Sequence, residues 1–275
     1  MTGADPGPGS DAHLAGELLD LARDIAEEVG RRLVVSLAGE RPAMSAKSTP
    51  TDLVTELDHW AEGHITERIL AARPHDGIIG EEGVDITGTS GVTWSIDPID
   101  GTVNFVHGIP GFSVSIAARL DGEGIAGTVV SPLHGDTFTA TRGGGAFRNG
   151  ERIAASRPPS AARSVIGTGF SYEPERRRRQ AEVLVRVLSR IADVRRFGSA
   201  AVDLCWVACG RLDGYWEVGL NDWDLAAGVL IATEAGARCG DLDGGAPSPR
   251  FVLAAPADTF DELAALLRDA DAANG

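Results

Sequence analysis

The sequence predicts an α/β protein built in layers, in which a more antiparallel half precedes a half of alternating strands and helices. Three observations lead to this fold class: a helical repeat of apolar residues near the N-terminus, short β-rich segments in the middle, and alternation of the two patterns after Pro158-Pro159. With 275 residues, the chain is long enough for one large domain or for two halves that share a core.

The first predicted element is an amphipathic helix from His13 to about Leu37. Apolar residues recur there at every third or fourth position, which is the period of one helix face. Ser10 or Asp11 is suited to cap the first turn, because a short polar side chain accepts hydrogen bonds from free backbone N–H groups. The preceding residues are rich in Gly and Pro, so residues 1–11 are expected to form a disordered lead.

The next part of the chain is predicted to contain one further helix and then mainly β-structure. Short segments of β-forming residues alternate with Gly, Pro and Asp, as in strands joined by turns. Asn149-Gly150 predicts a type I′ hairpin, because both residues tolerate positive φ angles. The predicted helix covers Asp52–Ala72, and the predicted strands are Gly77–Ile79, Val92–Ile96, Phe112–Leu120, Gly124–Ser131, Asp136–Thr141, Gly145–Arg148 and Glu151–Ile153.

Beyond Pro158-Pro159, strand and helix patterns alternate, which is typical of a layered α/β arrangement. The change of pattern places a boundary near Ser156–Ala161, between a half of residues 12–157 and a half of residues 158–275. The predicted strands of the second half are Ser164–Gly169, Asp193–Phe197, Gly214–Val218 and Phe251–Ala255, and its predicted helices are Pro174–Ala192, Ser199–Gly210, Asp222–Ala235 and Ala257–Asp269.

The composition argues against some classes of function and favours others. The formal net charge of −15 argues against a nucleic-acid binder, which normally carries a basic surface. A chain this acidic attracts phosphate only where cations or aimed backbone dipoles reverse the local field, which points towards a metal. No run approaches about 18 apolar residues, and the N-terminus lacks the pattern of a secretory signal, so we expect a cytoplasmic protein without a membrane span.

Two further groups of residues are interpreted as structural. The three cysteines are too few for a disulfide scaffold and agree with a reducing compartment. Cys205 and Cys209 are spaced to share one helix face, and we interpret them as small buried residues, with a metal or redox role as the less favoured alternative. The run Arg176–Arg179 is interpreted as a solvated helix face, with contact to RNA or phosphate as the alternative.

The chain contains three acidic clusters, Gly80–Gly83, Trp94–Phe105 and Asn221–Gly228. In the central cluster a strand delivers Asp97, and Asp100 follows three residues later, before a glycine that permits a turn. Two carboxylates at one strand end repel each other unless a cation lies between them, and oxygen ligands without a nearby His or Cys favour Mg²⁺. A helix starting after the glycine would aim free N–H groups at the same point, and that arrangement binds phosphate.

Each cluster alone also has a purely structural interpretation. Asp-Gly and Asp-Pro are common turn dipeptides, so the central cluster by itself is equally compatible with a turn. Adjacent acids such as Glu81 and Glu82 usually form a solvated face, and Asp224 is suited to an N-cap before a helix of small residues. The three clusters together favour a metal and phosphate site.

The same clusters carry a resemblance to a known family. The sequence resembles the inositol monophosphatase family, and within it the bacterial SuhB-type proteins, over nearly the full chain after about residue 12. The resemblance implies the alternating αβαβα sandwich that this family shares with fructose-1,6-bisphosphatase. The motifs that carry it are Lys47–Asp58, Gly80–Glu82, Asp97–Phe105, Gly198–Ala201, Glu217 and Trp223–Gly228.

The resemblance implies a site with two to three Mg²⁺ ions. Glu81, Asp97 and the backbone carbonyl of Ile99 would hold the first ion. Asp97, Asp100 and Asp224 would hold the second, so that Asp97 bridges the two. A third, weaker ion would sit against Glu81 and water.

The resemblance also implies catalytic and substrate-binding roles. Gly101 and Thr102 would offer backbone N–H groups to the phosphate, and Thr102 with Asp58 would orient and deprotonate the attacking water. Glu217 and the backbone of Ala200 would hold the hydroxyl groups of the substrate. The implied catalytic set is Asp58, Glu81 and Thr102, and the implied substrate-binding set is Asp100, Gly101, Thr102, Ala200, Glu217 and Asp224. The first half would thus carry the metal and phosphate site, and the second half the substrate contacts and Asp224.

The implied activity is Mg²⁺-dependent hydrolysis of a small phosphorylated polyol, inositol 1-phosphate, to inositol and phosphate by metal-activated water. Histidinol phosphate, fructose 1,6-bisphosphate and a nucleotide 3′-phosphate are alternative substrates. A regulatory protein that binds the transcription machinery is the alternative of another class. The resemblance further implies inhibition by Li⁺ and a homodimer.

Overall fold

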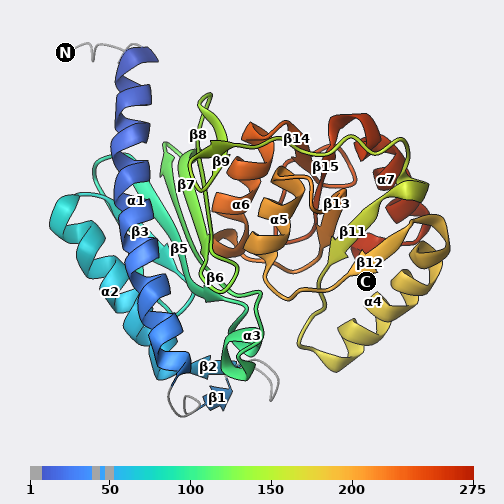
Figure 1. The fold of residues 1–275 in the computed structure, drawn as a ribbon, viewed down its shortest axis with the longest axis horizontal. Coiled ribbons are helices and arrows are strands. Elements are labelled where there is room, and N and C mark those ends of the chain that lie inside the picture. Colours follow the sequence, from blue (N-terminus) through green and yellow to red (C-terminus); the bar gives the residue numbers. More distant parts are fainter. Residues whose placement is uncertain (1–7, 39–43, 47–52) are drawn as a thin grey trace.

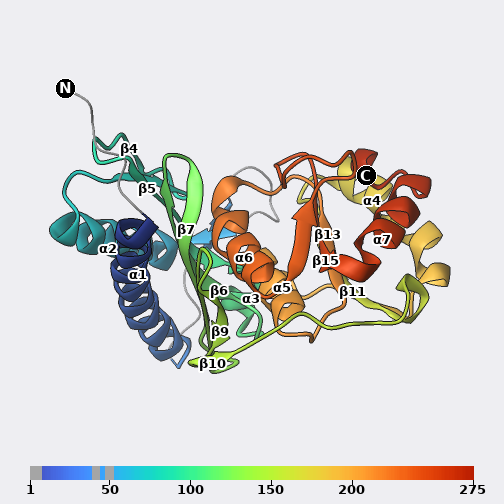
Figure 2. The same cartoon turned by 90° about the horizontal axis from the view of Figure 1, so that it is seen from above.

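The computed structural model describes residues 8–38, 44–46 and 53–275, and these form five layers (Figure 1). Helices α1 (Pro8–Leu37) and α2 (Glu56–Ala72) cover the outer face of an eight-stranded sheet. Helices α5 (Ala200–Ala208) and α6 (Asp222–Glu234) lie between this sheet and a five-stranded one, whose outer face carries α4 (Pro174–Val187) and α7 (Ala257–Asp269) (Figure 2). The predicted αβαβα sandwich is confirmed.

The two N-terminal helices differ from the prediction at their starts. Helix α1 begins at Pro8, before the predicted cap, because proline fits a first helical turn where its missing N–H has no partner. Most of the predicted lead, residues 1–7, lies outside the described residues. Helix α2 begins at Glu56 and not at Asp52, because Thr55 caps it and accepts a hydrogen bond from the Leu57 N–H at 3.1 Å.

The segment before α2 is extended, which the sequence interpretation missed. Strand β2 (Leu53–Thr55) pairs with β1 (Met44–Ala46) in a small antiparallel sheet. Two β-branched residues at its end favour this extended form over a longer helix. The part of the first family motif that precedes it, residues 47–52, lies outside the described residues.

The large sheet has the strand order β10-β9-β8-β7-β6-β5-β3-β4 and is antiparallel except where β3 meets β5. Its turn at Asn149-Gly150 has φ angles of 52° and 80°, which confirms the predicted hairpin. The bounds are β3 (Gly77–Gly80), β4 (Asp85–Ile86), β5 (Val92–Asp100), β6 (Ser113–Leu120), β7 (Glu123–Ser131), β8 (Asp136–Thr141), β9 (Gly145–Arg148) and β10 (Glu151–Arg152).

Strand β5 extends four residues further than predicted, from Ile96 to Asp100. Its register against β6 shifts between Asp97 and Asp100, and Pro98 lies within this irregularity. A proline is tolerated there because no regular ladder bond requires its missing N–H. The irregular end of β5 therefore carries the carboxylates of Asp97 and Asp100 at the same end of the sheet.

The second sheet has the order β12-β11-β13-β15-β14, with β11 parallel to both neighbours and β15 antiparallel to both of its own. Strand β14 was not predicted, and α4 ends at Val187 and not at Ala192, followed by a 3₁₀ turn at Leu188–Arg190. The bounds are β11 (Val165–Thr168), β12 (Asp193–Arg195), β13 (Gly214–Glu217), β14 (Ala237–Gly240) and β15 (Val252–Pro256).

Small residues allow the middle layer to pack closely. A Cβ on Gly228 of α6 would lie 2.8 Å from Leu204 Cβ of α5, and one on Gly127 of β7 would lie 3.2 Å from Ala227 Cα. Cys205 is buried in the same core and Cys209 is half-buried, and neither forms a disulfide. This agrees with their interpretation as packing residues. Within the described part of the chain, no helix combines the length and apolar character that crossing a membrane requires.

Candidate active site

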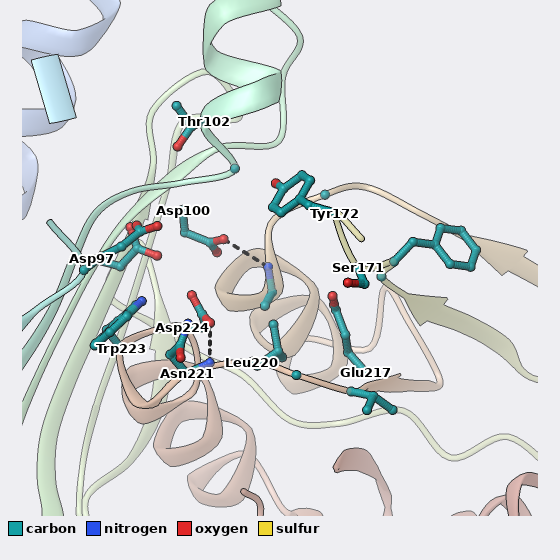
Figure 3. Close-up of a pocket in the computed structure, with 18 of the residues that line it drawn as sticks. Asp97, Asp100, Thr102, Ser171, Tyr172, Glu217, Leu220, Asn221, Trp223 and Asp224 are labelled. Atoms are coloured by element: carbon teal, nitrogen blue, oxygen red, sulfur yellow. Dashed lines mark hydrogen bonds between the residues drawn. The ribbon is translucent and has the colours of Figure 1, made fainter. Parts of the chain in front are cut away.

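A cavity of about 330 Å³ opens where the two halves meet (Figure 3). The first half contributes the loop after β3, the end of β5 and the start of the short helix α3 (Thr102–His107). The second half contributes the loop after β11, the starts of α5 and α6, and the end of β13. The predicted site residues that line the cavity are Glu81, Asp97, Ile99, Asp100, Gly101, Thr102, Ala200, Glu217 and Asp224.

The turn after β5 is held by its own side chains and by glycine. Asp97 accepts a hydrogen bond from the Ile99 N–H at 3.0 Å. The Thr102 hydroxyl lies 3.1 Å from the Ile99 carbonyl oxygen, an acceptor that its single proton can serve only in place of Asp58. Gly101 has a φ of 91°, and a Cβ there would lie 2.9 Å from the Gly198 carbonyl oxygen of the second half. Only glycine fits this position, and the helix predicted after it begins at Thr102.

Asp224 reaches the same point from the first turn of α6. It accepts a hydrogen bond from the Asn221 N–H at 2.6 Å, so it closes the turn while Asn221 occupies the N-cap position. Asp222 fixes the helix start to the large sheet, since it accepts hydrogen bonds from Ser95 of β5 at 2.5 Å and from Arg119 of β6. The N-cap interpretation of Asp224 is therefore corrected to a position inside the first turn.

The three aspartates converge. One carboxylate oxygen each from Asp97, Asp100 and Asp224 lies within 4.8 Å of the others. Burial raises the pKa of Asp97 well above its usual range, and the charges of Glu81, Asp100 and Asp224 raise it further. Among the residues that the structure describes, none of these three aspartates forms an ion pair. Buried, mutually repelling oxygen ligands without a protein cation fit a hard divalent metal ion.

Asp100 also joins the two halves. Its carboxylate accepts hydrogen bonds from the Ser199 hydroxyl at 2.6 Å, the Ala201 N–H at 2.8 Å and the Ala200 N–H at 3.3 Å. Burial raises the pKa of Asp100 to about 6, although these three donors act to lower it. Asp100 thus contacts the first turn of α5 as well as the acidic cluster. Ala200, whose backbone was predicted to contact the substrate, donates its N–H to Asp100.

Thr102 and Asp58, whose joint catalytic role stays a prediction, lie within hydrogen-bond distance of each other. The Thr102 hydroxyl donates to Asp58 Oδ1 at 3.2 Å. The other carboxylate oxygen of Asp58 accepts from the N–H and the hydroxyl of Thr55, at 2.8 Å and 2.6 Å. Asp58 is fully buried, so its orientation is fixed from both sides.

A buried glutamate that the sequence interpretation missed positions the loop carrying Glu81. Glu62 of α2 accepts hydrogen bonds from the N–H groups of Glu82 at 2.7 Å and Val84 at 3.0 Å. Its carboxylate occupies the space that a Cβ on Gly80 would take. Helix periodicity places Glu62 on α2 but does not indicate that its carboxylate is buried.

We expect Glu62→Gln to lower kcat by about tenfold or more, because an amide can accept from only one of the two N–H groups and the loop shifts. Phosphate release and a thermal melt measure the effect. Glu67→Gln, on the exposed face of the same helix, is the matched control and is expected to behave as wild type. Equal turnover in both variants would contradict a positioning role for Glu62.

Glu217 lies at the end of β13, on the opposite side of the cavity from Asp97 (Figure 3). It accepts a hydrogen bond from the hydroxyl of the fully buried Tyr215. Burial raises the pKa of Glu217 to about 7, while the Tyr215 hydroxyl and the charges of Arg196 and Arg176 act to lower it. Near neutral pH, this carboxyl group can therefore exchange between donor and acceptor of a hydrogen bond.

The raised pKa of Glu217 predicts a pH-dependent stability. Its pKa rises from 4.5 in the unfolded chain to about 7 when folded, so its contribution is complete below about pH 4.5 and is lost as pH rises through about 7. Relative to Glu217→Gln, we expect the wild type to lose about 1–3 kcal/mol of unfolding free energy between about pH 5 and pH 8. Denaturant unfolding of both proteins at the two pH values measures this difference, and a constant difference would contradict the shift.

The comparisons with known proteins agree with this geometry. The model of the inositol monophosphatase family matches residues 14–272. The chain belongs to the inositol monophosphatase family. The inositol-1-monophosphatase SuhB of Mycobacterium tuberculosis strain H37Rv is 44% identical over 284 residues, which cover 98% of this chain and 97% of that protein. The Nus factor SuhB of Escherichia coli K12 is 36% identical, over 91% of this chain and 98% of that protein.

Solved structures of the inositol monophosphatase family share the fold. The extragenic suppressor protein suhB from Bartonella henselae superposes with a TM-score of 0.87 at 36% identity, over 92% of this chain and 98% of that one. An inositol monophosphatase from Thermotoga maritima superposes with a TM-score of 0.85 at 33% identity, over 94% of this chain and 100% of that one. The resemblance inferred from the motifs is confirmed, and the protein is a phosphoric monoester hydrolase.

Proposed function

We propose that this protein is a Mg²⁺-dependent phosphatase that hydrolyses inositol 1-phosphate to inositol and phosphate. The observation that carries the proposal is the convergence of Asp97, Asp100 and Asp224 within 4.8 Å in a cavity that also contains Glu217. The three aspartates on one side of the cavity would bind metal ions, which in turn would hold the phosphate. The partly buried carboxyl group of Glu217 on the other side would bind hydroxyl groups. The names of the relatives support the same substrate.

The ligand set is proposed to hold two to three Mg²⁺ ions. Glu81, Asp97 and the Ile99 carbonyl would bind one ion, Asp97, Asp100 and Asp224 a second, and Glu81 with water a third. This assignment is supported by the oxygen-only donors and by the effect of the Glu81 charge on the pKa of Asp97. When bound, such ions lower the pKa of water and offset the charge of phosphoryl oxygens.

The chain itself would orient the reactants. Gly101 and Thr102 line the cavity, and their N–H groups would donate to the phosphate. The Thr102 hydroxyl would accept a proton from the attacking water as it passes its own proton to Asp58 Oδ1 along the hydrogen bond between them. Asp58 cannot turn away, because Thr55 holds its second oxygen, so the water would be directed in line with the scissile P–O bond.

Glu217 and the Ala200 backbone are proposed to hold the polyol, with Asp100 and Asp224 contributing on the metal side. Vicinal hydroxyl groups match a carboxyl group whose pKa is about 7, because such a group can donate to one hydroxyl and accept from the next. A Cβ on Gly169 would overlap the Glu217 carboxyl group, so the backbone there leaves room for this side chain. The substrate would thus be held at both ends of the cavity.

Phosphate release from a substrate panel with Mg²⁺ tests the proposal. The panel contains inositol 1-phosphate, histidinol phosphate, fructose 1,6-bisphosphate and a nucleotide 3′-phosphate. We expect the highest kcat/KM in this panel for inositol 1-phosphate. A preference of about tenfold or more for histidinol phosphate would overturn the choice of substrate and leave the chemistry intact.

A second candidate function is a regulatory one. Two relatives, from Vibrio cholerae and Escherichia coli, are named Nus factor SuhB, at 40% and 36% identity. If this chain also binds the transcription machinery independently of catalysis, Asp97→Asn should capture RNA polymerase from lysate as well as the wild type does. Capture by neither protein would remove this candidate.

We further propose a cytoplasmic homodimer that Li⁺ inhibits. These properties follow from the membership of the family. Light scattering at micromolar concentration tests the dimer, and a Li⁺ titration at fixed Mg²⁺ tests the inhibition. A monomer, or turnover that is unaffected by millimolar Li⁺, would contradict the respective statement.

A further inference from the structure

The wall of the cavity beside Glu217 is formed by the loop between β11 and α4. Figure 3 shows Ser171 of this loop on the same side as Glu217, across the cavity from Asp97. A Cβ on Gly169, at the start of the loop, would lie 2.0–2.1 Å from the carboxyl atoms of Glu217, so the loop packs directly against this group. The position of the loop therefore sets the space next to Glu217. The loop residues that line the cavity are Gly169, Phe170, Ser171 and Tyr172.

Gln180 is a polar residue on the buried face of α4. It is 7% exposed, and it shares this face with Val183 and Val187, which follow it at helical spacing. An amide group in such an apolar stripe is costly to bury unless it is hydrogen-bonded. The side-chain oxygen of Gln180 accepts a hydrogen bond from the Ser171 N–H at 2.8 Å. The buried amide group thus holds the backbone of the cavity loop.

The surroundings of Gln180 leave its side chain little room to move. Behind the loop lies a cavity of about 10 Å³, which has space for one water molecule at most and is lined by Gln180, Phe170 and Trp216, among others. On the other side, a Cβ on Gly275 would lie 3.4 Å from Gln180 Cγ and 3.2 Å from a methyl group of Val183. Because the amide group cannot easily turn away, its hydrogen bond restrains the Ser171 backbone.

A second contact from α4 to the same residue is exposed. Arg177 Nε donates a hydrogen bond to the Ser171 carbonyl oxygen at 2.9 Å, at a place where water can take over this role. Of the two contacts, the one from Gln180 is the better shielded, and its loss leaves an N–H group without a partner beside the protein interior. We therefore expect the position of the loop to depend on Gln180 more than on Arg177.

We propose that Gln180 is a positioning residue that determines how well the protein binds the polyol part of its substrate. By holding the Ser171 N–H, it fixes the loop against Glu217 and so shapes the end of the cavity that binds hydroxyl groups. This inference rests on the proposed function, which assigns Glu217 to the polyol. The aspartate cluster lies across the cavity from this loop, so the loss of Gln180 weakens substrate binding and leaves the chemical step intact.

The variant Gln180→Met tests the proposal, because methionine has a similar length but offers only a weak acceptor to the Ser171 N–H. Steady-state kinetics on inositol 1-phosphate with Mg²⁺ should show a KM that is about tenfold higher and a kcat within about twofold of the wild type. The inhibition constant of inorganic phosphate, which reports on the metal end of the cavity alone, should also stay within about twofold.

Two control variants separate positioning of the loop from a general loss of packing. Gln180→Glu keeps an acceptor oxygen at the same position and should bring KM back to within about threefold of the wild type. Arg177→Gln removes the exposed contact and should leave both KM and kcat near their wild-type values. If Gln180→Met does not fold, Gln180→Asn takes its place with the same expected result, because its shorter side chain cannot reach the loop.

Three results would overturn the positioning role. They are an unchanged KM in Gln180→Met, an equal rise of KM in Gln180→Glu, and a loss of kcat and phosphate binding in Gln180→Met as large as the change in KM. A wild type that does not hydrolyse inositol 1-phosphate would instead overturn the proposed function. The same comparison on the best substrate of the panel would then decide the role of Gln180.

Discussion

Asp97→Asn is expected to lower kcat by about a thousandfold or more with only a modest change in protein stability. Asp97 is the proposed bridge between two ions, so its loss removes one ligand from each and their alignment on the phosphate with it. An amide oxygen remains at the same position but carries no charge to hold a divalent cation. The measurement is single-substrate kinetics on inositol 1-phosphate across a Mg²⁺ titration.

The fold of the variant should survive, for a reason visible in the site. Burial and three neighbouring acids already oppose the ionised form of Asp97, so a neutral side chain relieves repulsion in the metal-free protein. A thermal melt in chelator should therefore place the variant level with or above the wild type. Asp243→Asn, an exposed surface change, controls for the loss of one charge. Near-normal turnover of Asp97→Asn at saturating Mg²⁺ would contradict the bridging assignment.

The sequence predicted most elements of the fold because their patterns are local. Helix α7 has the predicted bounds, and the hairpin turn follows from the conformational preferences of two adjacent residues. The errors arose where tertiary pairing decides. Strand β14 is an edge strand that pairs with β15. Strand β5 continues past Ile96 through Pro98 because an irregular register against β6 accommodates a proline.

The candidate site divides in the same way. Asp97, Asp100 and the start of α3 lie within one turn, so their proximity could be predicted from spacing alone. The approach of Asp224 was implied only by the resemblance, because it depends on how α6 is anchored by Asp222 to two strands of the other half. Glu62 carries no distinguishing pattern, since a helical glutamate is usually exposed.

Arg176 shows where a compositional interpretation was too coarse. It belongs to a run of four arginines that reads as one solvated face, and Arg178 does lie exposed among glutamates. Helical rotation turns Arg176 away from Arg178 towards the cavity, where Gly219 leaves space for it. The surroundings of each arginine in such a run depend on the neighbouring loops, and helical periodicity does not describe those loops.

Removing divalent cations is expected to abolish phosphate release, and returning Mg²⁺ should restore it. The same cation should stabilise the fold, because Asp97, Asp100 and Asp224 hold like charges within 4.8 Å in a buried place. At about a hundredfold excess over its dissociation constant, a ligand of the native state adds about 2.7 kcal/mol. For a chain of this size that corresponds to a rise in Tm of roughly 5 °C or more.

The rise in Tm distinguishes a cation bound at this cluster from a general salt effect. Wild type and Asp243→Asn should both gain stability from Mg²⁺ but not from K⁺ at the same ionic strength, because screening of exposed charges does not depend on a coordinating site. Asp97→Asn should gain little, since it lacks the ligand proposed to be shared. An equal rise in Tm for Asp97→Asn, or an equal effect of K⁺ on the wild type, would place the stabilising ion elsewhere. Asp97, Asp100 and Asp224 would then require another source of compensating charge.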